Sequence, residues 1–405
     1  MKKLSLFYFF FFSFFWIISY FSYPFCHLLE LEERVVNLLL YSTLLFINIC
    51  FLIIYVSNFG FNVKLFSRLY IYAILIVVMQ LFFSILFNTI DEWLPTLIRY
   101  CLYLSTFAIF YIVFYKNMIN INLLSITITI LTLILILSSL VEIMSGNVQF
   151  LNGAYRVSGN FRGHHLAFAL SCFVNINYLL HVNFKQFNLI RIILLILLFV
   201  AFFMSHSRLL LISLFISNLS VIYLLKKQIF MKFLYLISSI FLLFSLFLLV
   251  LYTDLMPRIS ELFFSNKIDS STLYRIFIVN ESLNNLSFSQ YFTGIGLGGF
   301  NEFFFLATNE RDVAAHNDYL LMLVEGGIVS LILYVYIQYK VVIDILKTKN
   351  SKSNIAKLVF VLFFGIEILG FLENAHYFYQ SEILIFIILA YFYASEKKGF
   401  ILSSK

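Results

Sequence analysis

Charged residues are scarce in this sequence. Only 12% of its 405 residues are charged and 62% are hydrophobic, whereas about 25% of a soluble domain is charged. Apolar runs recur from end to end, and a run of about 20 residues is long enough to cross a bilayer as a helix. The alternating strand pattern of an outer-membrane barrel is missing. The sequence therefore predicts an all-α polytopic integral membrane protein and excludes a soluble domain.

Cysteine motifs and a cleavable leader are also missing. The four cysteines show no CxxC spacing, so neither a disulfide framework nor a metal site is indicated. Residues 1–23 begin with Lys2 and Lys3, and the roughly twenty apolar residues that follow exceed the signal-peptide core of about 7–15 residues. No small-residue cleavage site follows them. We therefore expect a retained first span.

The apolar runs predict about twelve transmembrane helices. Spans one to nine fall within residues 1–253, a large polar outer loop covers 254–317, and spans ten to twelve with a cytoplasmic tail fill 318–405. The expected spans lie near residues 4–23, 35–57, 69–88, 95–115, 120–143, 164–182, 189–205, 208–225, 233–252, 318–339, 357–372 and 381–395.

The positive-inside rule orients these spans, because short cytoplasmic loops collect Lys and Arg. With the N-terminus inside, 18 of the 27 basic residues are cytoplasmic, and so are both termini. The net charge of +7 follows this pattern and does not indicate nucleic-acid binding. Eight of the nine outer basic residues are Arg, whose planar fork of donors suits phosphate. The nine are Arg34, Arg99, Arg156, Arg162, Arg208, Arg258, Lys267, Arg275 and Arg311.

Two short segments place arginines at the outer membrane surface. The turn between spans five and six, residues 152–165, holds Arg156 and Arg162 with three glycines, a combination that suits an anionic ligand. The alternative is a polar turn that contacts only lipid headgroups. Arg208 lies at the junction of spans seven and eight, where an ionisable group is costly and indicates function. Its alternative is simple snorkelling to the interface.

The large outer loop contributes two more candidates. Apolar spacing predicts an amphipathic helix over 272–288, with Arg275 on its polar side. The glycine cluster 294–300 formally contains GxGxxG, but without a βαβ context it does not predict a dinucleotide site. We expect a hinge or a close-approach turn for substrate there, with Gly296 as a contact.

His316 opens the tenth span at its outer end. A histidine at this place can act as a general base near neutral pH. Asp318 is the expected partner that holds its tautomer, because Glu325 lies more than two turns further on. The alternative is a merely polar start to the helix, with Asn317 or Asp318 as its cap. The sequence leaves open the roles of Glu367, Glu373 and His376.

These residues together predict one reaction. The outer loops contain neither a DxD pair nor a cluster with metal-ligand spacing, so we expect no metal and no cofactor. Fixed positive charge from arginine then stabilises a departing diphosphate. His316 removes the proton from an attacking sugar hydroxyl. The predicted function is therefore transfer of a lipid-linked sugar chain.

Five short motifs occur in a specific order on the outer side. They are Arg156-Val-Ser-Gly-Asn-Phe, Ser207-Arg208-Leu-Leu-Leu, Tyr274-Arg275, Thr293-Gly-Ile-Gly-Leu-Gly-Gly-Phe300, and His316-Asn317 followed by nine residues and Gly327. In these motifs, best over residues 150–340, the chain resembles the O-antigen ligase and O-antigen polymerase superfamily of bacterial envelope enzymes.

The resemblance implies a GT-C-like helical fold in the bacterial inner membrane. It also implies metal-independent inverting transfer from an undecaprenyl-diphosphate-linked glycan at the periplasmic face. It makes Arg208 and Arg275 the diphosphate binders and His316 the base. The further substrate contacts expected from it are Arg156, Arg162, Asn317 and Gly296.

Three functions remain open. A polymerase joins one lipid-linked repeat unit to another, and the Arg-rich turn 156–162 favours this reading. A ligase instead hands the polymer to lipid A-core. A transporter or flippase often shows inverted repeats with helices broken at the midplane, and no such internal symmetry is visible. The expected partners are the lipid-linked donor and acceptor, membrane lipid, a chain-length regulator and a flippase, with no nucleic acid.

Overall fold

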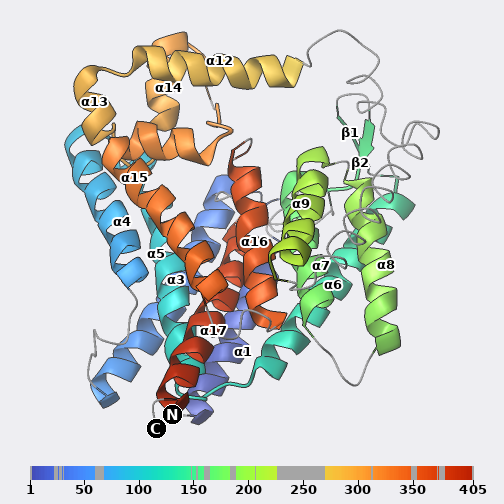
Figure 1. The fold of residues 1–405 in the computed structure, drawn as a ribbon. Coiled ribbons are helices and arrows are strands. Elements are labelled where there is room, and N and C mark those ends of the chain that lie inside the picture. Colours follow the sequence, from blue (N-terminus) through green and yellow to red (C-terminus); the bar gives the residue numbers. More distant parts are fainter. Residues whose placement is uncertain are drawn as a thin grey trace. The chain divides into compact units, whose positions relative to one another are not determined.

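The computed structural model is built almost entirely of helices (Figure 1). It describes residues 2–21, 26, 30, 32–59, 68–146, 148–151, 154–158, 165–182, 188–205, 207–225, 270–311, 313–347, 354–371, 373 and 379–403. The chain forms two compact units, each assembled from separate stretches of sequence. Unit 1 comprises Met1–Thr127, Phe277–Thr348 and Gly370–Lys405, and unit 2 comprises Ile128–Ile276 and Lys349–Leu369.

Unit 1 contains the helices at both ends of the chain and those that follow the large loop. Its helices are α1 (Lys2–Ser19), α3 (Glu33–Phe59), α4 (Arg68–Phe87), α5 (Ile90–Tyr115), α13 (Phe288–Thr293), α14 (Phe300–Thr308), α15 (Asp318–Lys347) and α17 (Tyr379–Ser403). Two helices run across the boundary between the units: α6 (Ile121–Met144) and α12 (Ser270–Asn285).

Helix α5 lies at the centre of unit 1. Its residues 107–114 are all buried, because α3, α4 and α17 pack around it. Several polar groups in this core pair with one another, which a hydrocarbon environment favours. The Tyr8 hydroxyl donates to Asn48 Oδ1 at 2.8 Å, and Asn48 Nδ2 donates to Ser105 and Thr106 at 2.9 and 3.0 Å. This network fixes α1, α3 and α5 against each other.

Helix α7 (His165–His181) lies at the centre of unit 2. Residues 166–179 are buried, with α8 (Asn188–Met204) and α9 (Arg208–Leu225) packed against the helix. Its polar side chains are paired inside the unit: Thr132 Oγ1 donates to Asn175 Oδ1 at 3.1 Å, and Asn218 Nδ2 donates to Asn177 Oδ1 at 2.8 Å. The described part of this unit also contains α16 (Asn354–Gly370).

Unit 2 also contains a two-stranded hairpin that the all-α prediction did not include. Strands β1 (Gln149–Leu151) and β2 (Ala154–Arg156) pair antiparallel. Each strand is three residues long, shorter than the run of about four to eight residues over which alternation becomes visible in a sequence. The hairpin lies within the turn between the fifth and sixth predicted spans.

Several helices have the length and composition of membrane spans. Among the described residues, five are long and apolar enough to cross a bilayer: Lys2–Ser19, Val35–Asn58, Ile90–Tyr115, Ile121–Met144 and Asp318–Lys347. The protein is therefore a multi-pass membrane protein of helical build. Helices occupy the positions of the predicted spans, except that the ninth, 233–252, lies outside the described residues. The predicted amphipathic helix over 272–288 corresponds to α12.

Helix α15 is broken near its start, which the predicted continuous span at 318–339 did not include. Gly327 has φ 68° and ψ −177°, outside the helical region, and the helix then continues to Lys347. A break of this kind leaves the carbonyls of the preceding turn without their usual helical partners. Those carbonyls are used by the glycine cluster described below.

Candidate active site around His316 and the glycine loop

The glycine loop, residues 294–299, is bonded directly to the broken turn of α15. The backbone N–H of Ile295 donates to the Val324 carbonyl and that of Gly296 to the Glu325 carbonyl, both at 2.9 Å. On the other side, Ser84 of α4 exchanges hydrogen bonds with the Leu297 backbone. Buried backbone groups need partners, so the loop and the break in α15 satisfy each other.

Glycine is required at several positions of this loop because other backbone segments of the protein approach it closely. A Cβ atom at Gly294 would lie 2.2 Å from the Glu325 carbonyl oxygen, and one at Gly298 would lie 2.3 Å from the Glu92 carbonyl oxygen. Both glycines also have φ near +70°, a conformation that L-residues with side chains rarely adopt. Gly296 is buried, with Ser84 Cα 2.7 Å from where its Cβ would stand. The close approach that the sequence predicts here is therefore made to other backbone, and a substrate contact at Gly296 stays a prediction.

His316 lies directly before α15 and is held by a carboxylate. Its Nδ1 lies 2.9 Å from Glu373 Oε2, and the two side chains are 32% and 11% exposed. An ionised carboxylate can only accept hydrogen bonds, so Nδ1 carries the proton in this pair. Nε2 is then the basic nitrogen of the neutral ring. The arrangement is suited to taking a proton from a bound hydroxyl.

The predicted partner of His316 was wrong. The structure shows Glu373 at Nδ1, whereas Asp318 is fully buried in α15, with its carboxylate beside Gly370. Glu373 lies 57 residues from His316 in the sequence, so only the fold identifies it. The available signal was an acidic residue in the turn after the eleventh predicted span.

Asn317 explains why Glu373 reaches His316. Its Oδ1 accepts from the Leu320 backbone N–H at 2.8 Å, which is the capping role considered from the sequence. Its Nδ2 donates to the Phe371 carbonyl at 2.9 Å. Asn317 therefore ties the start of α15 to the segment that carries Glu373. A substrate contact of Asn317 stays a prediction.

The structure describes some of the predicted arginines fully and others only in part or not at all. Arg156 is buried and its Nη1 lies 2.7 Å from His165 Nε2, so it joins the hairpin to the start of α7. Arg208 is the first residue of α9, and its side chain lies outside what the structure describes. Arg275 is half-buried on α12, whose neighbouring residues Leu273, Tyr274 and Ile276 are exposed. Also outside the described residues are Arg162, His206 and His376.

The structure thus brings His316, Asn317 and Glu373 together within unit 1. Arg208 and Arg275 belong to unit 2. A common site for these two arginines and His316 stays a prediction.

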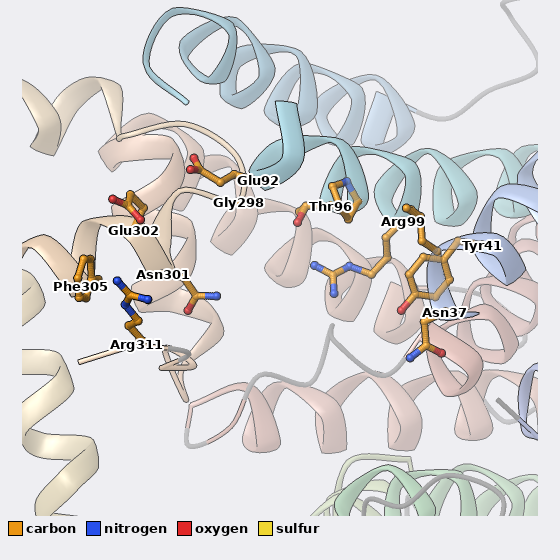
Figure 2. A pocket seen from close by; sticks show the side chains of 12 residues that line it. Asn37, Tyr41, Glu92, Thr96, Arg99, Gly298, Asn301, Glu302, Phe305 and Arg311 are labelled. Atoms are coloured by element: carbon orange, nitrogen blue, oxygen red, sulfur yellow. The ribbon is translucent and has the colours of Figure 1, made fainter. Parts of the chain in front are cut away.

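Unit 1 also contains a cavity of about 670 Å³ that the sequence did not reveal (Figure 2). It is bounded by α3, by the first turns of α5, and by the segment from the glycine loop to Arg311. Its lining residues are Asn37, Leu38, Tyr41, Glu92, Pro95, Thr96, Arg99, Gly298, Asn301, Glu302, Phe305 and Arg311.

The fold and the site define a helical multi-pass membrane protein with a carboxylate-supported histidine before a broken helix. Comparison with protein families narrows this class. Residues 193–335 match the family model described as O-Antigen ligase. This match supports the resemblance to the O-antigen ligase and polymerase superfamily that the motifs of the chain predicted. A search of curated proteins gave no match.

The matched region covers part of the predicted site. It includes Arg208, Arg275 and His316, together with the glycine loop and Gly327. The hairpin with Arg156 precedes the region and Glu373 follows it. The carboxylate partner of the histidine is thus visible only in the structure.

Proposed function

We propose that this protein is a surface-polysaccharide polymerase of the bacterial inner membrane. It joins undecaprenyl-diphosphate-linked repeat units at the periplasmic face, within a GT-C-like bundle of about twelve spans with both termini cytoplasmic. The family match supports a lipid-linked glycan as substrate. The pair of His316 and Glu373 is the observation that carries the catalytic part of the proposal.

In the proposed reaction the acceptor hydroxyl attacks the anomeric carbon of the donor sugar. His316 Nε2 takes the hydroxyl proton as the new glycosidic bond forms. The bond between the anomeric carbon and the diphosphate oxygen breaks with inversion, and the lipid diphosphate leaves with the bonding electrons. General-base catalysis of this kind contributes about 10²–10⁴-fold.

The remaining residues have supporting roles in this proposal. Glu373 keeps the proton of neutral His316 on Nδ1 and stabilises the imidazolium that forms. Arg208 and Arg275 stabilise the charge on the departing diphosphate, a role to which the guanidinium fork is suited. Asn317 positions Glu373, and Arg156, Arg162 and Gly296 contact the glycan. No metal or cofactor takes part.

A ligase is the second candidate function. The description of the matched family favours it directly. The preference for a polymerase rests on the Arg-rich turn 156–162 of the sequence. The two enzymes share the same chemistry and differ in the acceptor.

The size distribution of surface polysaccharide in a deletion strain distinguishes the candidates. Loss of a polymerase leaves lipid A-core capped by a single repeat unit. Loss of a ligase leaves full-length polymer on its lipid carrier. Repeat units that accumulate inside the cell would instead indicate a transporter. Reintroduced wild-type protein restores the ladder, and His316→Ala does not.

A further inference from the structure

The cavity in unit 1 is lined by one face of α5. Glu92, Pro95, Thr96 and Arg99 line it, and their spacing of three, four and seven residues places them on a single face of a helix. Arg99 is only 7% exposed on its helix. A charged group inside an apolar helix is costly and is retained for a function.

Arg99 extends into the cavity from α5 (Figure 2). Asn301 and Arg311 lie on one side of it, and Asn37 and Tyr41 on the other. Arg99 also interacts electrostatically with Glu325. Glu325 in turn interacts with the backbone at Gly298 and Phe300, in the segment that follows Gly296.

The wall formed by α14 and the segment after it adds a second cation. Arg311 Cζ lies 4.7 Å from the centroid of the Phe305 ring, within the range of a cation–π contact. Asn301 and Glu302 line the same wall and are exposed. On the α5 side, Glu92 is already engaged, since its carboxylate accepts from the Thr89 backbone N–H at 3.3 Å.

Helix α14 links this cavity to the segment that carries His316. Asn301 and Phe305, four residues apart, line the cavity. Phe300 and Phe304, on the other side of the helix, are buried in one hydrophobic cluster with Ala315 and with Leu320 of α15. The cavity wall and the residue before His316 therefore share one packed core.

We propose that the cavity binds an acidic sugar of the glycan substrate. The lining combines planar amides, two carboxylates and a Tyr41 hydroxyl, which suit sugar hydroxyls, with two guanidinium groups, which suit an anion. A volume of about 670 Å³ lies within the range of small-molecule sites. The carboxylate or phosphate substituent of the sugar faces Arg99, and Arg311 closes the outer wall. The inference rests on the proposed function in taking a glycan as the ligand.

Direct binding to the full-length protein in detergent tests this inference. The first probe is a tetrasaccharide containing glucuronic acid, and the second is the same tetrasaccharide with its carboxylates reduced to alcohols. Inorganic diphosphate is the third probe and represents the headgroup of the lipid carrier. We expect the acidic tetrasaccharide to bind at least about tenfold more tightly than the reduced one, which corresponds to one charge-assisted contact.

Substitutions of the lining residues test whether that binding preference arises in the cavity. Arg99→Gln and Arg311→Gln each abolish the preference for the acidic probe, and Arg99→Lys retains part of it. Arg191→Gln, which removes a guanidinium of α8 in unit 2, leaves the preference unchanged. Arg311 is exposed, so its substitution keeps the test valid if Arg99→Gln fails to fold.

Two results would overturn the inference. One is equal affinity for the acidic and the reduced tetrasaccharide. The other is diphosphate binding that falls with Arg99→Gln, which would assign the cavity to the lipid carrier. Failure of the proposed function is seen separately: a protein that binds the acidic probe but supports no polysaccharide ladder refutes the function alone, and a protein that makes polymer without the preference refutes only this inference.

Discussion

Removing the charge of Glu373 tests whether this carboxylate sets the tautomer of His316. In Glu373→Gln the side chain keeps its size, but its amide can donate a hydrogen bond to Nδ1. The ring then carries its proton on Nε2, the nitrogen that has to accept the proton of the acceptor hydroxyl. The carboxylate that stabilises the imidazolium is lost as well. We expect the rate of glycosyl transfer to fall by about 10²-fold or more, close to the whole effect of a general base.

The assay is transfer between purified lipid-linked repeat units, with product measured at short times. Glu281→Gln makes the same chemical change on α12, where the carboxylate accepts a hydrogen bond from Asn285 Nδ2 at 3.3 Å, and we expect little effect on transfer. Thermal unfolding in detergent checks that Glu373→Gln remains folded.

A double-mutant cycle separates this role from an independent one. If Glu373 acts through His316, the variant His316→Ala with Glu373→Gln is no slower than His316→Ala alone, because residues that act as a unit are not additive. Full activity of Glu373→Gln beside an inactive His316→Ala would refute the reasoning. So would additive losses in the double variant.

Two further predictions concern the scaffold. Gly294→Ala places a Cβ 2.2 Å from the Glu325 carbonyl oxygen at positive φ, and we expect a loss of about 2–5 kcal/mol of stability. Gly146→Ala also has positive φ but meets nothing within 4 Å, so it should lose only about 1–2 kcal/mol in the same unfolding measurement, and equal losses would contradict the packing argument. Asn317→Asp keeps the cap on α15 but loses the bond to the Phe371 carbonyl, so we expect slower transfer at nearly unchanged stability. Asn317→Ala should also lose about 1 kcal/mol, and unchanged transfer in both would show that the tie does not position Glu373.

The sequence predicted what depends on local composition. Apolar runs located the helices, since a span needs about 20 apolar residues wherever it lies. Amphipathic spacing located α12, and the motif at His316-Asn317 located the start of α15. The resemblance to the O-antigen ligase and polymerase superfamily followed from the order of the motifs. Each of these signals lies within a short stretch of chain.

What the sequence missed depends on contacts between distant residues. The partner of His316 comes from a turn 57 residues away, so proximity in sequence favoured Asp318 instead. The break at Gly327 exists because the glycine loop supplies alternative partners for the carbonyls before it. Arg99 and Arg311 were only two of nine outer basic residues until the fold placed them on one cavity. None of these pairings leaves a periodic pattern in the sequence.

The measurement that tests the account most directly is the release of undecaprenyl diphosphate by purified protein from lipid-linked repeat units. We expect one diphosphate to be released for each glycosidic bond formed, with inversion at the anomeric carbon. We also expect a decrease of about 10²-fold or more in His316→Ala. Release and bond formation at the wild-type rate in His316→Ala would contradict the account.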